Sequence, residues 1–246
     1  MQTGKQRAWT IWLVVTELVL LVTAGGCILL YRMQLLALKP ALLGVAGALF
    51  LVIFMGMFSL LVILVCVVKG RSGLSRWALL AVLFALPTLV GVLVQGLRSV
   101  GVPSIHDIST DLEDPPRFVR AAELRDPQDN PLEYAGVKLA NRQRQGYPEI
   151  GPQLVALPAR EAFVRCLEIA GKLGWEVTVQ DPDGGRIEAV DQSLLFGFID
   201  DIVIRIRSVD DKSRVDLRSV SRVGVSDLGV NARRIKAFQE ELNEYR

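Results

Sequence analysis

The sequence predicts a membrane protein in which three transmembrane α-helices precede an α+β two-layer domain with a four-stranded antiparallel sheet and two helices. Three observations lead to this fold class. The chain is 51% hydrophobic with a mean hydropathy of +0.36, which is high for an ordinary globular protein. Its long apolar runs all lie in the first hundred residues, and short alternating runs bounded by turn residues follow only after residue 170.

The membrane anchor is expected over residues 1–98, with spans at about 9–31, 41–68 and 77–97. The second and third runs contain no charged residue, and the first contains only Glu17. Each run reaches the roughly 20 residues that a helix needs to cross the hydrocarbon layer. A cleaved signal peptide ending near Cys27 is the alternative for the N-terminus, although the apolar run continues to Leu30.

The orientation follows from the basic residues beside the spans, because cytoplasmic loops are enriched in Lys and Arg. One side of the membrane would hold Lys5, Arg7, Lys69, Arg71 and Arg76, and the other would hold Arg32, Lys39 and Arg98. We therefore expect a multi-pass protein of the plasma (inner) membrane with a cytoplasmic N-terminus. The domain at 99–246 would then be extracytoplasmic, in the periplasm of a Gram-negative host.

The polar domain is mildly acidic, since residues 98–246 hold 21 Lys and Arg against 25 Asp and Glu. A domain that binds phosphate backbones is normally basic, so nucleic acid is excluded as an expected partner. Cys27 and Cys66 lie within spans, and Cys166 falls on the apolar side of a predicted helix as a small core residue. The cysteines therefore predict no disulfide framework.

The lead-in segment, residues 99–157, is rich in Pro, Gly, Asp and Gln and has little periodicity. We expect extended chain laid over the folded core rather than regular elements.

Regular elements are expected from Pro158 onward. A helix begins at this proline and ends before Gly171 and Gly174, and a second amphipathic helix covers about 228–243, with Leu228, Ile235, Phe238 and Leu242 on one side. Strands are predicted at 175–180, 186–191, 202–208 and 214–220. Asp200 and Asp201 point to opposite sides of a strand and cannot form an acid/base pair. The apolar cluster Leu194, Leu195, Phe196 and Phe198 is interpreted as core or domain edge, and an exposed version of it would mark a membrane-facing or partner-facing patch.

Five ordered blocks carry a family resemblance: Ser104 to Asp111, Asp114 to Phe118, Gly146 to Ile150, Phe196 to Arg207, and Ser213 to Ile235. Over about residues 100–242 the chain resembles the bacterial and plastid family catalogued as domain of unknown function 1499. The resemblance implies no assigned activity, substrate or cofactor. It does imply a place in the cell envelope or thylakoid, and it leaves the three spans unexplained.

No nucleophile elbow, zinc spacing, P-loop or dinucleotide fingerprint occurs, so the sequence predicts no catalytic residue, cofactor or metal. His106 beside Asp107 could form a base with its orienting acid, but adjacent residues seldom face each other in extended chain. The segment with Asp107, Asp111, Glu113 and Asp114 could gather a hard cation. A solvated or arginine-paired acidic stretch is the preferred interpretation.

The polar face of the predicted sheet gives the sharpest site hypothesis. Pairing the last two strands about the turn at Asp210 sets Arg205 opposite Asp216 and Arg207 opposite Arg214, and Arg218 adds a further charge. We therefore expect a negatively charged group to lie over this excess of arginine. The candidates are the chain's own residues 107–114, an external anion or acidic partner, or solvent alone.

These observations predict a membrane-anchored protein of the cell envelope and favour a non-enzymatic binding module over an enzyme. The expected partners are the bilayer and either another envelope protein or an anionic ligand. Two alternatives remain open: an enzyme with a site around His106, Asp107 and nearby arginines, and a transport accessory that uses the intramembrane Glu17.

Overall fold

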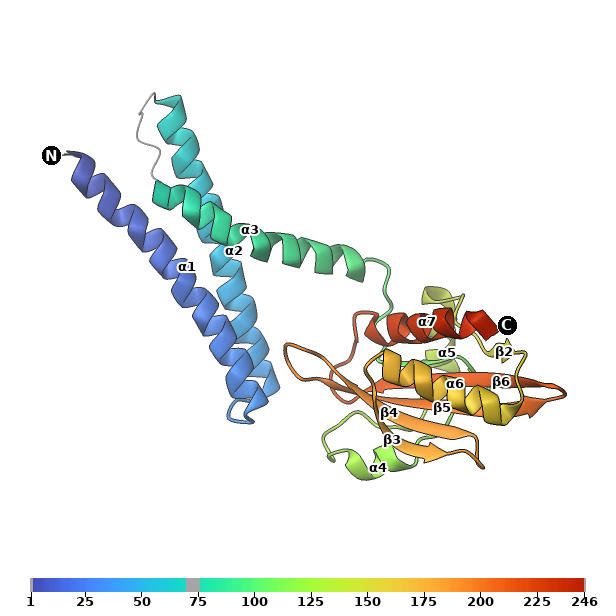
Figure 1. Cartoon of the computed structure of the whole chain (residues 1–246). Coiled ribbons are helices and arrows are strands. Elements are labelled where there is room, and N and C mark those ends of the chain that lie inside the picture. Colours follow the sequence, from blue (N-terminus) through green and yellow to red (C-terminus); the bar gives the residue numbers. More distant parts are fainter. Residues whose placement is uncertain (1, 70–75, 246) are drawn as a thin grey trace. The chain divides into compact units, whose positions relative to one another are not determined.

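The computed structural model describes residues 2–69 and 76–245, and side chains from Thr10 onward (Figure 1). The chain divides into two compact units, Met1–Arg98 and Ser99–Arg246, which are described in turn. Lys5, Arg7 and Arg71, which enter the orientation argument, lie outside the residues whose side chains are described.

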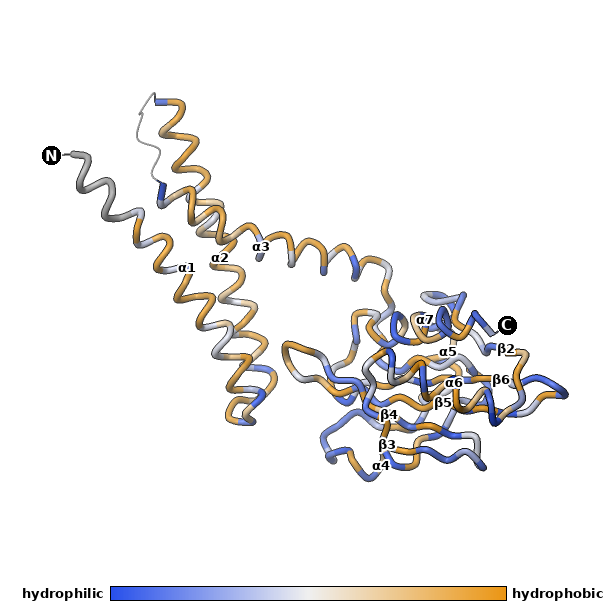
Figure 2. The backbone as a smooth tube through the Cα atoms, in the orientation of Figure 1, coloured by the Kyte–Doolittle hydropathy of each residue, from blue (hydrophilic) through white to orange (hydrophobic). Residues whose placement is uncertain are grey.

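Unit 1 consists of three long helices, α1 (Gln2–Arg32), α2 (Leu38–Val68) and α3 (Arg76–Ser99). Each is long and apolar enough to cross a membrane, with candidate spans Thr10–Arg32, Leu38–Val68 and Arg76–Ser99. The apolar character of all three is visible in Figure 2. The prediction of three long apolar helices at the N-terminal end of the chain is confirmed.

Small residues let the helices of unit 1 approach closely. A Cβ atom placed on Gly44 would lie 2.6 Å from Sγ of Cys27 on α1, and one on Gly56 would lie 2.3 Å from Cβ of Ala85 on α3. Close backbone approach of this kind is how helices associate in lipid, where burial of apolar surface gives little driving force.

Unit 2 contains one antiparallel sheet of six strands in the order β1-β6-β5-β4-β3, with β2 also paired to β6. Four strands form a continuous meander: β3 (Glu176–Asp181), β4 (Arg186–Gln192), β5 (Ile199–Val209) and β6 (Lys212–Ser221). They match the four predicted runs. The short strands β1 (Asp107–Ser109) and β2 (Gln153–Val155) both pair with β6, beside Arg218 to Val220 and Ser213 to Val215 respectively.

The predicted strand count of four was wrong because both extra strands lie in the lead-in segment and are three residues long. A run of three residues is too short to display the alternation that reveals a strand. The lead-in also contains two helices, α4 (Arg120–Leu124) and α5 (Val137–Gly146). It is therefore a structured part of the unit and not only extended chain.

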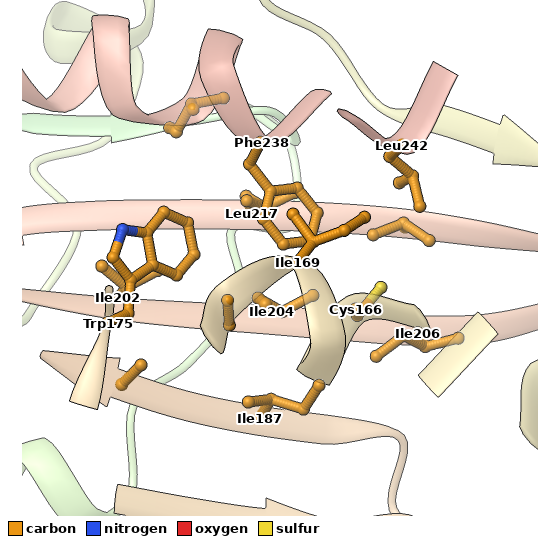
Figure 3. Close-up of a cluster of buried hydrophobic side chains, with 14 of the residues drawn as sticks. Cys166, Ile169, Trp175, Ile187, Ile202, Ile204, Ile206, Leu217, Phe238 and Leu242 are labelled. Carbon is orange, nitrogen blue, oxygen red and sulfur yellow. The ribbon is translucent and has the colours of Figure 1, made fainter. Parts of the chain in front are cut away.

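Helices α6 (Ala159–Lys172) and α7 (Val230–Leu242) lie on the apolar face of the sheet (Figure 1). Figure 3 shows the core that they enclose, in which the rings of Trp175 and Phe238 stack with centroids 5.5 Å apart. Cys166 is fully buried there, as predicted, and burial raises the pKa of its thiol to about 12. The prediction that Leu228 lies on the apolar side of this helix was wrong, because Leu228 precedes α7 and is 43% exposed.

Candidate functional site

The polar face of the sheet carries the arginines that the sequence singled out, in the predicted register. Arg205 lies opposite Asp216, and Arg207 lies opposite Arg214. These side chains point away from α6 and α7 because their neighbours Ile204, Ile206 and Val215 belong to the core.

The acidic segment of residues 107–114 lies directly on these arginines. One carboxylate oxygen of Asp111 accepts hydrogen bonds from Arg214 at 2.6 Å, Arg205 at 3.0 Å and Arg207 at 3.2 Å. Asp114 contacts Arg205 at 2.9 Å and Arg207 at 3.4 Å. The first of the three candidates for the cover, the chain's own acidic residues, is therefore the one present.

Asp216 completes the cluster from within the sheet. It is fully buried and lies 3.0 Å from Arg205, 2.8 Å from Arg207 and 3.0 Å from Arg214. Three arginines thus meet three aspartates, Asp111, Asp114 and Asp216, and the cluster is electrically balanced. An external anion would have to displace a carboxylate of the same chain.

The protonation of Asp111 reflects this setting. Burial opposes its ionisation, but N–H groups donated by Glu113 and Asp114 and the charges of Arg214 and Arg205 together hold its pKa below the ordinary value. Asp111 is therefore a carboxylate at neutral pH. Glu113 contributes its backbone N–H to this arrangement, and its side chain is exposed.

Asp107 forms a separate pair with Arg218. The two carboxylate oxygens accept bonds of 2.9 and 2.8 Å from Arg218, and both side chains are buried. The Arg218 guanidinium also lies 5.3 Å from the ring centroids of Phe118 and of Tyr134 and donates to the carbonyl of Leu132 at 2.8 Å. An arginine held by a bidentate carboxylate and two rings has little freedom to move.

This arginine lies at the wall of a cavity of about 550 Å³. Apolar and aromatic groups line it together with charged residues: Pro115, Phe118, Ala122, Leu132, Tyr134, Glu113, Asp114, Glu133, Arg117 and Arg218. The volume lies within the range of about 300–1,000 Å³ typical of small-molecule sites. Burial, with a contribution from Asp107, raises the pKa of Tyr134 to about 12, and its buried hydroxyl has no hydrogen-bond partner within the described part of the chain.

His106 and Asp107 do not form a catalytic pair. Nδ1 of His106 lies 3.4 Å from the carbonyl oxygen of Val225, whereas Asp107 is engaged by Arg218. The backbone carbonyl of His106 accepts bonds from Ser221 and Asn231, so this residue ties β1 to the start of α7. Among the described residues, no three or more His, Cys, Asp or Glu side chains group as metal ligands would.

A family model described as a protein of unknown function, DUF1499, matches residues 107–242, which is more than half of the chain. The chain belongs to the DUF1499 family. The match begins at Asp107 and so includes the acidic segment, the arginines and both core helices. His106, Glu17 and all of unit 1 lie outside the DUF1499 match.

No curated protein matches the chain. A crystal structure of TTHA0849 from Thermus thermophilus is similar to 38% of this chain and 92% of its own, at 11% identity and a TM-score of 0.22.

Two further clusters within the DUF1499 region were not singled out as sites from the sequence. Glu188 is buried and accepts the N–H groups of Val119 and Ala121, which fixes the first turn of α4. Asp201 is buried between Arg125 at 2.7 Å and Arg222 at 2.8 Å. A single acidic residue in a strand gives no pattern that predicts such a partner.

Asp200 and Asp201 do point to opposite sides of β5, as predicted. Asp200 meets Arg234 of α7 at 2.7 Å, on the face covered by the core helices. Arg234 also contacts Asp191 at 2.7 Å.

Glu17 is fully buried within unit 1, and its two carboxylate oxygens have no hydrogen-bond partner among the described residues. The hydroxyl of Thr23, on the same helix, donates to the carbonyl of Val19 at 2.8 Å.

Proposed function

We propose that this DUF1499 protein is a membrane-anchored, non-enzymatic binding module that holds its ligand in the cavity beside Arg218. The observation that carries the proposal is a cavity of about 550 Å³ that combines aromatic and apolar walls with charged groups. The arginine cluster that suggested an anionic ligand is already balanced by Asp111, Asp114 and Asp216. The binding site is therefore assigned to the neighbouring cavity.

The charges at this cavity favour a ligand, or a partner's side chain, that carries a positive charge on an apolar body. Arg218 is neutralised by Asp107 and Asp114 by the arginine cluster, which leaves Glu113 and Glu133 against Arg117 among the exposed lining groups. A cation is attracted both by this acidic excess and by aromatic rings. Another envelope protein that presents a lysine or arginine side chain would satisfy the same chemistry.

Two matched probes test this assignment. Phenethylamine and phenylacetate share an aromatic body and carry opposite charges. We expect phenethylamine to raise the unfolding temperature of the purified full chain, because a ligand that binds only the folded state stabilises it. The variant Ala122→Phe, which fills the cavity from an exposed position, should lose this response. Stabilisation by phenylacetate would show that the cavity prefers an anionic ligand. No response to either probe would refute the cavity as a binding site.

The same proposal places unit 2 outside the cytoplasm and the N-terminus inside, on the basis of the Lys and Arg residues beside the spans. A reporter that works only outside the cytoplasm should be active when fused after Arg246 and inactive when fused between Arg71 and Ser75. The reverse pattern would overturn the orientation.

A transport accessory remains a second candidate because Glu17 is fully buried with no bonding partner among the described residues. An ionisable group inside a membrane span is costly and is often functional. Proton flux into vesicles that hold the full chain, followed with an internal pH dye, should exceed that of Glu17→Gln at equal protein levels. Equal flux from both proteins would remove this candidate.

A further inference from the structure

The turn between β4 and β5 presents an apolar tip to the surface of unit 2. Residues 193–198 contain no charged side chain, Leu194 is 87% exposed and Leu195 is 65% exposed. The rings of Phe196 and Phe198 stack behind them with centroids 5.0 Å apart. Figure 2 shows this tip as a hydrophobic projection at the end of the sheet.

A second loop with exposed apolar side chains, residues 222–230, lies at the same end of the sheet, and its two charged residues are Arg222 and Asp227. The N–H of Arg222 donates to the carbonyl of Ile199, the first residue of β5, at 3.0 Å. In this loop Val225 is 79% exposed. Leu228 is 43% exposed and has a φ of 52°, a left-handed conformation that is unfavourable for a side chain of this size. The loop thus holds large apolar groups outward despite backbone strain.

The chain enters unit 2 at this end. Helix α3 ends at Ser99, and Val102 already packs against the core of unit 2. The carbonyl of Ile105 accepts the N–H of Asp227 at 3.1 Å, and the ring of His106 meets the carbonyl of Val225. Only Val100 and Gly101 lie between Ser99 and Val102, and these three Cα–Cα steps span at most about 11 Å.

We propose that this end of unit 2, formed by the 193–198 tip and the 222–230 loop, is a membrane-contacting surface that inserts into the interfacial layer of the bilayer that α3 spans. The short connection keeps the surface within reach of the lipid, which makes lipid its occupant. Exposed aliphatic groups backed by aromatic rings are the chemistry that suits this layer. The contact would fix the orientation of the domain on the membrane. It does not depend on the ligand cavity.

Site-directed fluorescence in the full chain tests the contact. Single cysteines are introduced as Leu195→Cys, Val225→Cys and, as the control, Asp211→Cys, in a chain whose Cys27, Cys66 and Cys166 are replaced by alanine. Asp211 is exposed in the turn after β5, at the opposite end of that strand. Each protein is labelled with bimane and reconstituted into phosphatidylcholine and phosphatidylglycerol vesicles, with or without lipid that carries a spin label on its acyl chain.

The expected result is quenching by the spin-labelled lipid that is several times stronger at positions 195 and 225 than at position 211. Iodide in the water should quench in the reverse order. Lipid quenching at 195 no stronger than at 211 would overturn the proposal. In that case strong iodide quenching at 195 would show that the tip lies in water, and weak quenching by both agents would show that protein covers it.

Discussion

On one face of the sheet, α6 and α7 enclose an apolar core. The cover segment, residues 107–134, begins with strand β1, whose Ile108 belongs to that core, and then crosses the other face, where buried charges and hydrogen bonds hold it. The apolar face needs only side chains of suitable size, such as Ile204, Leu217 and Phe238. The polar face needs particular partners, Asp111 with three arginines and Glu188 with two backbone N–H groups. The apolar face can therefore tolerate substitutions among apolar residues of similar size, whereas the polar face cannot tolerate the loss of a specific partner.

This difference also predicts how the unit opens. Charge-based contacts weaken with acid and salt, whereas apolar burial does not depend on the ionisation of carboxylates. The cover segment should therefore detach under conditions in which the helices stay in place. Local opening of this kind is common in folded proteins.

The largest effect is expected from the apolar face. Phe238→Ala removes a fully buried ring that stacks on Trp175, and we expect it to lower the free energy of unfolding of unit 2 by about 3–5 kcal/mol. Urea unfolding of the full chain in detergent, followed by near-ultraviolet circular dichroism, measures this loss. Glu240→Ala on the exposed side of the same helix is the control and should change little. A similar loss from both variants would contradict the assigned core.

On the polar face, Asp111→Asn leaves the three arginines Arg205, Arg207 and Arg214 without one of their carboxylates. We expect the free energy of unfolding to fall by about 2 kcal/mol at neutral pH, because the partly buried arginines would lose a negatively charged hydrogen-bond acceptor. Asp211→Asn in the exposed turn is the control.

The loss of stability caused by Asp111→Asn should also depend on pH. The folded pKa of Asp111 lies below that of the unfolded chain, about 3.9, so its ionised form stabilises the fold above that value, and the contribution disappears as the pH falls through the folded pKa. The difference between wild type and Asp111→Asn should therefore narrow on acidification below about pH 4. A difference that is constant with pH would argue against the ion-pair explanation.

A smaller and more local effect is expected from Glu188→Gln. Both carboxylate oxygens accept backbone N–H groups at α4, and the glutamine amide would place a donor against one of them. We expect the free energy of unfolding of Glu188→Gln to be lower than that of wild type by about 1–2 kcal/mol. Hydrogen exchange should accelerate in residues 107–134 while α6 and α7 remain protected. Uniform acceleration across unit 2 would mean that the two faces open together.

The smallest effect is expected from Arg120→Ala. Its ion pair with Glu123 in the cover segment is half exposed on both sides, and such pairs contribute below about 0.5 kcal/mol. Urea unfolding should not distinguish this variant from wild type. A loss comparable to that of Asp111→Asn would show that charge alone, rather than burial with several partners, holds the cover.

The period-two alternation predicted the apolar face of the sheet because residues such as Ile202, Ile204 and Ile206 alternate along a long strand, β5, that ends at a clear turn. The strands β1 and β2 could not be predicted, because they exist only through pairing with β6. The pairing of Asp107, Asp111 and Asp114 with arginines followed from strand register plus an excess of charge. The contacts of Glu188 and Asp201 depend on where α4 and Arg125 fold, which no local pattern reveals.

The pairing of β1 with β6 has a consequence for the order in which the protein is made. Asp107 is synthesised long before Arg218, its partner 111 positions later in the chain. Contacts between residues so far apart form slowly, and exposed segments that await their partners are prone to aggregate. During synthesis the cover segment therefore cannot pair with the sheet until β6 has been made. Strand β6, which is made late, thus completes the fold of the cover segment, which is made early.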